Sequence, residues 1–95
     1  MLVFREIFVA KPGQASKMAK LMKEVMEADP NFKGRIMTDV VGDYNTVVIE
    51  GEIESLAAWE KQMEGYANMP PEIAEKMKNY TDMYLTGKRE IFRVW

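Results

Sequence analysis

The stretch FREIFVA, Phe4 to Ala10, decides the fold. A similar stretch, KREIFRVW, Lys88 to Trp95, lies near the other end of the chain. The tetrapeptide Arg-Glu-Ile-Phe occurs in both. In each stretch, apolar residues stand at positions of both parities, so both sides of an extended chain are mostly apolar. This pattern is typical of β-strands that are buried on both faces. We therefore expect a strand near each end of the chain.

The two copies offer opposite charges to each other. In an antiparallel pair of suitable register, Arg5 faces Glu90. The same register sets Glu6 opposite Arg89, and each cross-strand pair of this kind contributes about 0.2–1 kcal/mol. The alternative is that two strands of similar composition arose by chance, and a register shift of one residue would destroy the pairing. The repeat thus predicts cross-strand complementarity rather than an internal duplication.

The segment after the first strand predicts a helix and a hairpin. The sequence KPG at 11–13 ends the strand and opens a helix, which Pro30 ends. Strands at 35–41 and 46–53, joined by the turn GDYN at 42–45, form the hairpin. The helix is amphipathic, with apolar residues at steps of three and four: Ala15, Met18, Met22, Val25 and Met26.

A second helical region follows the hairpin, and prolines divide it. Ser55 is the expected N-cap of its first part, and NMPPE at 68–72 interrupts it. Pro71 then opens another helix, which Gly87 stops. The first part carries one apolar stripe: Leu56, Trp59, Met63 and Tyr66. The second part carries another: Ile73, Met77, Tyr80 and Tyr84.

This order of elements, β-α-β-β-α-β with the second helical segment split, predicts an α+β fold. Right-handed crossovers place both helical segments on one face of a four-stranded antiparallel sheet of the ferredoxin-like kind. The first strand is then central and the last lies beside it. A length of 95 residues fits a single domain that spans 1–95.

The other face of this sheet predicts a partner. Helices cover only one face, yet the first and last strands are apolar on both, so the second face would be a large exposed apolar patch. Such patches mark interfaces, and a second copy of the same sheet packed face to face would cover this one. The sequence therefore predicts a homodimer.

The composition excludes several classes of function. With 13 basic and 15 acidic residues the net charge is -2, so we expect no nucleic-acid partner. The chain has no Cys and no His, and we expect no metal and no cofactor. No span approaches about 18 apolar residues, and the opening MLVFREIF carries two charges where a signal peptide is apolar. We expect a cytoplasmic protein that does not enter membranes.

Three parts of the chain resemble a known family. They are REIFVAKPGQ at 5–14, TDVVGDYNTVVIEGEIESLAAWEKQM at 38–63, and the aromatic-rich closing strand. Together they are similar to the dimeric α+β barrel superfamily, and within it to the NIPSNAP-like small bacterial proteins, which are related to antibiotic-biosynthesis-monooxygenase-like domains. The resemblance implies that two sheets close into a barrel between subunits, with a small cavity in each half.

The superfamily hosts several activities, and fold alone does not choose among them. It includes cofactor-free monooxygenases, small isomerases, haem-degrading enzymes and ligand-sensing domains. The absence of His gives no support to branches that bind haem iron or move protons through imidazole. We therefore carry over the fold and the dimer from the resemblance, and the catalytic residues stay unassigned.

Polar residues of the hairpin are the first candidates for a site. Asp39, Glu50 and Glu52 could provide an acid/base pair in a closed cavity, because two such carboxylates push their pKa values apart. Arg35 could orient an anionic substrate beside them. The other interpretation is that these side chains form ion pairs in a wet dimer interface or at strand ends.

Aromatic and Met side chains of the helical segments are the second group of candidates. They could line a cavity wall with polar handles, or they could simply pack helix against sheet. The complete set of ligand-binding candidates from both groups is Arg35, Asp39, Glu50, Trp59, Met63, Tyr66 and Tyr84.

Two classes of function remain open. The protein could bind a small, largely apolar organic molecule as a cofactor-independent monooxygenase or isomerase. It could instead be a non-catalytic binding or sensing module, or a purely structural dimer filled by its own side chains. A cavity with a carboxylate and a donor at hydrogen-bonding distance would favour the enzyme, whereas an aliphatic, occluded interior would favour packing alone.

Overall fold

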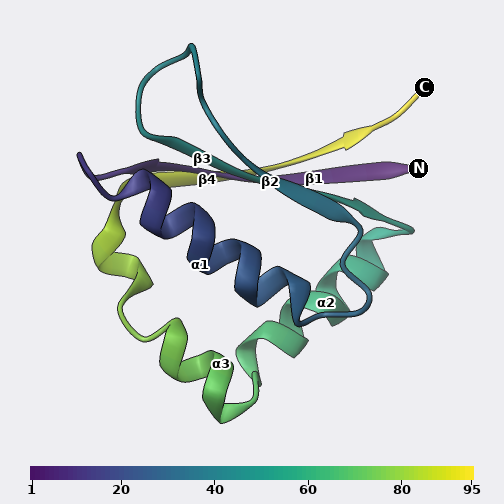
Figure 1. Cartoon of the computed structure of the whole chain (residues 1–95). Coiled ribbons are helices and arrows are strands. Elements are labelled where there is room, and N and C mark those ends of the chain that lie inside the picture. The colour runs from purple at the N-terminus through teal and green to yellow at the C-terminus, as the bar shows by residue number, and fades with distance from the viewer.

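The computed structural model describes residues 1–95 and consists of a four-stranded antiparallel sheet with all helices on one face (Figure 1). The strand order is β2-β3-β1-β4, which confirms the predicted α+β, ferredoxin-like arrangement. The elements are β1 (Leu2–Ala10), α1 (Ala15–Glu27), β2 (Gly34–Thr38), β3 (Thr46–Ile53), α2 (Leu56–Ala67), α3 (Pro71–Lys76), a 3-10 helix (Tyr80–Met83) and β4 (Tyr84–Arg93).

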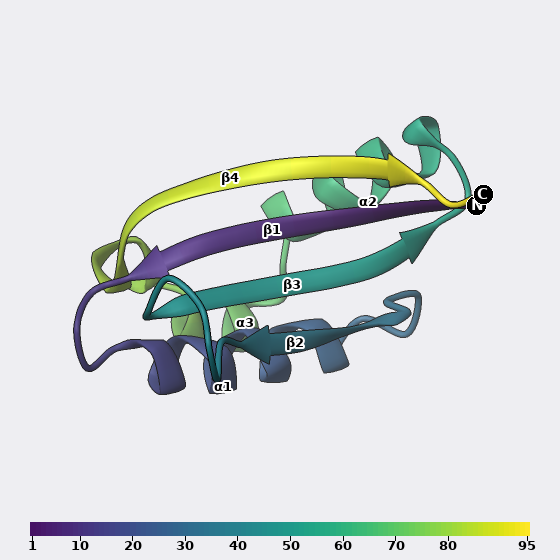
Figure 2. The same ribbon diagram turned by 90° about the horizontal axis from the view of Figure 1, so that it is seen from above.

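The two copies of Arg-Glu-Ile-Phe pair in the predicted register. In the antiparallel β1–β4 pair, Arg5 lies opposite Glu90 and Glu6 lies opposite Arg89. Figure 2 shows β4 running beside β1 along its whole length. The Arg89 guanidinium forms an ion pair with the Glu6 carboxylate, so this half of the predicted complementarity is confirmed.

Arg5 and Glu90, the other predicted pair, bind other partners. The guanidinium of Arg5 turns to the opposite neighbour and binds Glu50 of β3 at 2.9 Å, while Glu90 pairs with Lys88 of its own strand at 3.1 Å. Arg5 has this choice because β1 is central and has a strand on each side. Cross-strand pairing therefore holds the centre of the sheet through β3 as well as β4.

The hydrophobic core lies between α1 and the sheet. The predicted apolar stripe of α1 is confirmed, because Met18, Met22, Val25 and Met26 are all buried. They pack with the helix-facing residues of the sheet: Phe4, Ala10, Val47, Ile49 and Ile53. The Phe4 ring lies over Gly51, where an added Cβ would come within 2.5 Å of it. Glycine at this position leaves room for the ring against the sheet.

The hairpin is present, but its first strand is shorter than predicted. β2 ends at Thr38 rather than at residue 41, and Val40 stands in the connecting loop. The Asp39 carboxylate accepts a hydrogen bond from the Thr46 backbone N–H at 2.8 Å and so closes the end of the ladder. A side chain that bonds nearby backbone competes with strand continuation. The connection therefore spans residues 39–45 and is longer than a tight turn.

The predicted helix beyond Lys76 is wrong. α3 is a short helix, a single 3-10 turn follows it, and Tyr84 already belongs to β4. Gly87 lies inside this strand rather than at a helix end, with the Phe8 ring against its open side. Phe8 also contacts Tyr84, with ring centroids 4.8 Å apart. This aromatic packing across β1 and β4 outweighs the helical spacing of the local sequence.

The helical layer covers the sheet unevenly. α1 buries four residues, whereas α2 and α3 bury none. Figure 1 shows α3 farther from the sheet than α1. Leu56, predicted on the inner stripe of α2, is 59% exposed. None of the helices has the length and apolar character needed to cross a membrane. The loosely packed part of the layer, beside α2 and α3, is where an open cleft is found.

Candidate functional site

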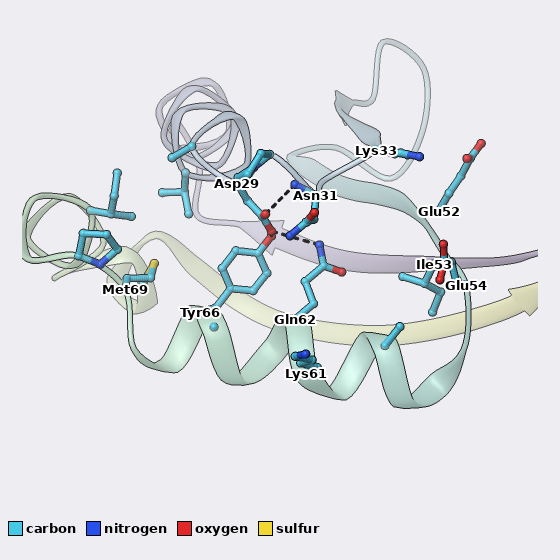
Figure 3. A pocket seen from close by; sticks show the side chains of 17 residues that line it. Asp29, Asn31, Lys33, Glu52, Ile53, Glu54, Lys61, Gln62, Tyr66 and Met69 are labelled. Carbon is cyan, nitrogen blue, oxygen red and sulfur yellow. Dashed lines mark hydrogen bonds between the residues drawn. The ribbon is translucent and has the colours of Figure 1, made fainter.

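A cleft of about 670 Å³ lies between the end of α1, the end of β3, and the helices α2 and α3 (Figure 3). Its apolar lining includes Val25 of α1, Ile53 of β3, Ile73 of α3, and Met69, which lies between α2 and α3. Its polar lining includes Asp29, Asn31, Lys33, Glu52, Glu54, Lys61, Gln62 and Tyr66. The cleft therefore combines an apolar wall with charges of both signs.

One stripe of α2 forms a wall of the cleft. The helix begins because Ser55 caps it: the serine hydroxyl oxygen accepts a hydrogen bond from the Ala58 N–H at 3.1 Å. Residues three and four apart then lie on one face, and this face lines the cleft with Ala58, Lys61, Gln62, Gly65 and Tyr66. A Cβ added at Gly65 would meet no atom within 4 Å. The wall is therefore open at Gly65.

Asp29 is the polar centre of the cleft. α1 ends just before it, and its carboxylate faces α2, from which Gln62 and Tyr66 point towards it (Figure 3). Tyr66 donates its hydroxyl proton to Asp29 Oδ2 at 3.0 Å, and Gln62 Nε2 donates to the same oxygen at 3.2 Å. The backbone N–H of Asn31 donates to Oδ1 at 2.9 Å. One carboxylate thus joins the α1 end to α2.

These hydrogen bonds fix the protonation states of the two partners. Burial raises the pKa of Asp29, but the hydrogen bonds from Asn31, Gln62 and Tyr66 outweigh it and lower the pKa below its ordinary value. Burial, together with the neighbouring Asp29 charge, raises the pKa of Tyr66. Asp29 therefore stays an anionic acceptor and Tyr66 a protonated donor. The pair is suited to anchoring a ligand rather than to abstracting a proton.

A second polar cluster lies on the helix-facing side of β1 and β4. The Glu6 side chain is only 14% exposed and pairs with Arg89, whose guanidinium carbon lies 5.4 Å from the centre of the Trp59 ring. Burial raises the pKa of Glu6, and the charge and hydrogen bond of Arg89 offset this only in part. The Trp59 Nε1–H is buried without a hydrogen-bond partner. In this cluster a carboxylate with a raised pKa pairs with an arginine, and the same arginine lies over a tryptophan ring whose N–H has no partner.

The open face of the sheet carries a different carboxylate. Glu50 binds Arg5 through one oxygen at 2.9 Å and Arg35 through the other at 2.9 Å. The hydrogen bond from Arg5 is the main cause that lowers the pKa of Glu50, with Arg35 adding to it and burial opposing it. The Arg5 guanidinium also lies over the Phe92 ring at 5.6 Å. This is the ion-pair arrangement that was one of the two interpretations of these residues.

The structure does not bring the seven candidates together. Arg35 and Glu50 lie on the open face, and Asp39 closes the β2–β3 loop. Trp59 is on α2 beneath β4, and Met63 is half-buried on the same helix. Tyr84 begins β4 beside Phe8. Among the candidates, Tyr66 lines the cleft.

Sequence reasoning missed the residues that organise the cleft, and it identified the Glu6–Arg89 pair without its burial. Asp29 and Gln62 are 33 positions apart, so no local pattern links them. The burial of Glu6 could have been found, because this residue shares its parity with the core residue Phe4 and with Phe8. A charge among apolar, helix-facing positions is the signal for a shielded carboxylate. No group of three or more His, Cys, Asp or Glu side chains is arranged to hold a metal ion.

Several solved structures share this fold at low sequence identity. A NIPSNAP-like domain protein from Burkholderia xenovorans matches with a TM-score of 0.83 and 16% identity, over 99% of this chain and 84% of that one. A NIPSNAP family protein from Agrobacterium tumefaciens matches with a TM-score of 0.79 and 14% identity, over 96% of this chain and 82% of that one. An antibiotic biosynthesis monooxygenase matches with a TM-score of 0.71 and 15% identity, over 100% of this chain and 99% of that one.

No protein-family model matches the sequence, and no curated protein is significantly similar to it. The resemblance to NIPSNAP-like and antibiotic-biosynthesis-monooxygenase-like proteins is therefore confirmed as a likeness of fold. At these identities the likeness concerns the fold alone.

Proposed function

We propose that this protein binds a small, largely apolar organic molecule in the cleft beside α2, and that it does so as a homodimer whose open sheet faces pack into a barrel. The observation that carries the proposal is the cleft of about 670 Å³ with a hydrogen-bonded carboxylate at its centre. Pockets for small molecules span about 300–1,000 Å³ and combine apolar walls with a few polar groups.

The packing of α2 supports a ligand at this place. Tyr66, which lines the cleft, is only half-buried, and no residue of the helix is fully buried. A molecule seated against the cleft-lining face of α2 would remove further apolar surface from water, which gains about 25 cal/mol for each Å². A ligand in the cleft would therefore bury apolar surface of α2 that the protein by itself leaves exposed to water.

Asp29 supports the presence of a donor group on that ligand. A carboxylate offers about four lone-pair sites, and three hydrogen bonds already reach Asp29, two on Oδ2 and one on Oδ1. One site on Oδ1 is left for a hydroxyl or amine of the ligand. The matching ligand is an apolar body with one hydrogen-bond donor.

The open face supports the homodimer. Val3, Ile7 and Val48 on it are half-buried and Phe92 is 48% exposed. No helix covers them (Figure 1), and exposed apolar surface of this kind favours association. The cytoplasmic location expected from the sequence stays a prediction.

A second candidate is catalysis without a cofactor, by isomerisation or by oxygenation as the name of one structural neighbour suggests. The specific observation in its favour is Glu6, a shielded carboxylate whose pKa is raised above its ordinary value, because general acids and bases are often carboxylates perturbed by burial. The unpartnered Trp59 Nε1–H beside Arg89 could orient a polar substrate atom.

Gly65 provides the test of ligand binding. Substitution Gly65→Leu fills open space in the cleft, and Gly65→Ala is the matched control that adds only a methyl group. Both changes favour the helix by up to about 1 kcal/mol, so neither should unfold the protein. We expect native mass spectrometry and thermal-shift screening of a metabolite panel to detect a ligand with wild type and Gly65→Ala, and not with Gly65→Leu.

Two outcomes would contradict the proposal. One is wild-type protein that retains no compound and shows no thermal shift with any member of the panel. The other is a ligand that binds Gly65→Leu as tightly as wild type, because the molecule would then lie outside the cleft. For the catalytic candidate, Glu6→Gln should abolish turnover of a bound compound while leaving its affinity unchanged.

A further inference from the structure

The loop between β2 and β3, residues 39–45, carries an unusual cluster of exposed apolar side chains. Val40 is 98% exposed, Val41 is 96% exposed and Tyr44 is 81% exposed. Connecting loops are normally polar where they meet water, and a cluster of fully exposed apolar side chains marks an interaction site. The exposure of these side chains thus indicates that the loop contacts a partner surface.

The position of the loop shows which side that partner occupies. In Figure 1 the loop rises from the sheet on the side opposite the helices, and the view from above in Figure 2 places it over the ends of β2 and β3. Its base is held by paired hydrogen bonds between Asp39 and Thr46. Tyr44 and Asn45 adopt positive φ values of 64° and 55°. The loop is a shaped projection beside the open face.

We propose that residues 39–45 form an arm that packs against a second copy of this chain across the open face. This inference rests on the homodimer of the proposed function and names the segment that holds it together. The charges of the open face favour a second copy, because its cations and anions balance and no excess of one sign opposes self-association. They are Arg5, Arg35 and Lys88 against Glu50, Glu52 and Glu90.

The arm also adds to the contact area of the sheet. Four strands about 4.8 Å apart, with about nine residues at 3.3 Å each, give a face of roughly 570 Å² in projection. This is an upper bound for the footprint, since β2 has only five residues. A standard interface buries about 800 Å² of accessible surface on each partner, so two symmetric arms, one from each copy, would extend and strengthen an interface of this size.

Removal of the apolar arm side chains tests the proposal. The variant carries Val40→Ser and Val41→Ser, and Leu56→Ser is the matched control, because Leu56 is 59% exposed on the helical layer. Each copy loses two valines, so a dimer of the arm variant loses four from its interface. We therefore expect the dimer dissociation constant, measured by analytical ultracentrifugation, to rise by about 100-fold or more. The control should match wild type within about threefold.

A mobility measurement checks the arm without weakening it. The chain has no cysteine, so Val41→Cys and Leu56→Cys each take one nitroxide label at a single site. As the protein concentration rises through the dimerisation range, the label at Val41 should become immobilised, and the label at Leu56 should not. Circular dichroism spectra and melting curves confirm that every variant is folded.

The outcomes separate the arm from the dimer. A wild-type dimer whose affinity is unchanged in the arm variant, or whose Val41 label stays mobile, overturns the arm and leaves the homodimer standing. Equal weakening by the Leu56→Ser control also overturns it. Wild-type protein that is monomeric at every concentration overturns both the arm and the homodimer, and assigns the exposed loop to a different occupant.

Discussion

The hydrogen bond between Tyr66 and Asp29 should be worth a measurable coupling energy, because it links α2 to the end of α1. The perturbations are Tyr66→Phe, Asp29→Ala and the double substitution. Tyr66→Phe removes the bond of 3.0 Å, and Asp29→Ala removes all three bonds to the carboxylate. Hydrogen bonds to charged groups contribute about 1.5–3 kcal/mol each, and those at a half-buried site lie at the low end.

From these contacts we expect Tyr66→Phe to cost about 1–1.5 kcal/mol and Asp29→Ala about 2–4 kcal/mol of the free energy of unfolding. The double variant should be no less stable than Asp29→Ala by more than a few tenths, which corresponds to a coupling energy of about 1 kcal/mol. For a domain of this size, 1 kcal/mol shifts the melting temperature by about 4–8 °C. The single variants are therefore easy to tell apart.

The assay is urea unfolding of the four proteins at pH 7 and at one protein concentration, since the proposed dimerisation would make stability concentration-dependent. Tyr80→Phe is the matched control, because Tyr80 is another half-buried tyrosine and its hydroxyl makes no hydrogen bond. If the two single effects add within about 0.3–0.5 kcal/mol, the residues are not coupled and the assignment of Asp29 as the junction of the cleft is refuted.

Two carboxylates with the same 14% exposure should respond oppositely to neutralisation. The pKa of Glu50 is lowered, so its contribution is present above the ordinary value of 4.5 and lost as pH falls; in urea unfolding, Glu50→Gln should cost about 1–2 kcal/mol at pH 7 and little at pH 3. The pKa of Glu6 is raised, so its contribution is lost as pH rises, and Glu6→Gln should be as stable as wild type or more stable at pH 7. Two glycines offer a further contrast: Gly51→Ala brings a Cβ within 2.5 Å of Phe4 and should cost about 1–3 kcal/mol, whereas Gly65→Ala enters open space and should gain up to about 1 kcal/mol, as melting curves would show.

Periodicity predicted those parts of the fold in which local pattern and tertiary packing agree. α1 follows its apolar stripe, and β1 follows from its two apolar parities. The pattern failed after Lys76, where Met77, Tyr80 and Tyr84 keep a helical spacing but the chain turns into a strand. The partner that decides this is Phe8, more than seventy residues away, and a local pattern holds no information about it.

The candidate site was less accessible to sequence reasoning than the fold. A cleft depends on how far α2 stands from the sheet, and helical spacing gives the direction of a side chain without its depth. Trp59, Met63 and Tyr66 were correctly placed on one helix, yet each is half-buried. Asp29 follows the helix and precedes a proline, which identifies a chain turn and not its distant donors on α2.

The two shielded carboxylates argue that the two faces of the sheet serve different purposes. Burying a charge is tolerated when its partners satisfy it, and Glu50 has an arginine on each oxygen. A second copy could therefore cover Glu50 without leaving its charge unpaired. Glu6 has one arginine and keeps a raised pKa, and that arginine lies over the ring of Trp59, whose N–H has no partner. Arg89 offsets the burial of Glu6 only in part, so under the proposed function the helix-facing side is where chemistry should be tested and the open face is where assembly should be tested.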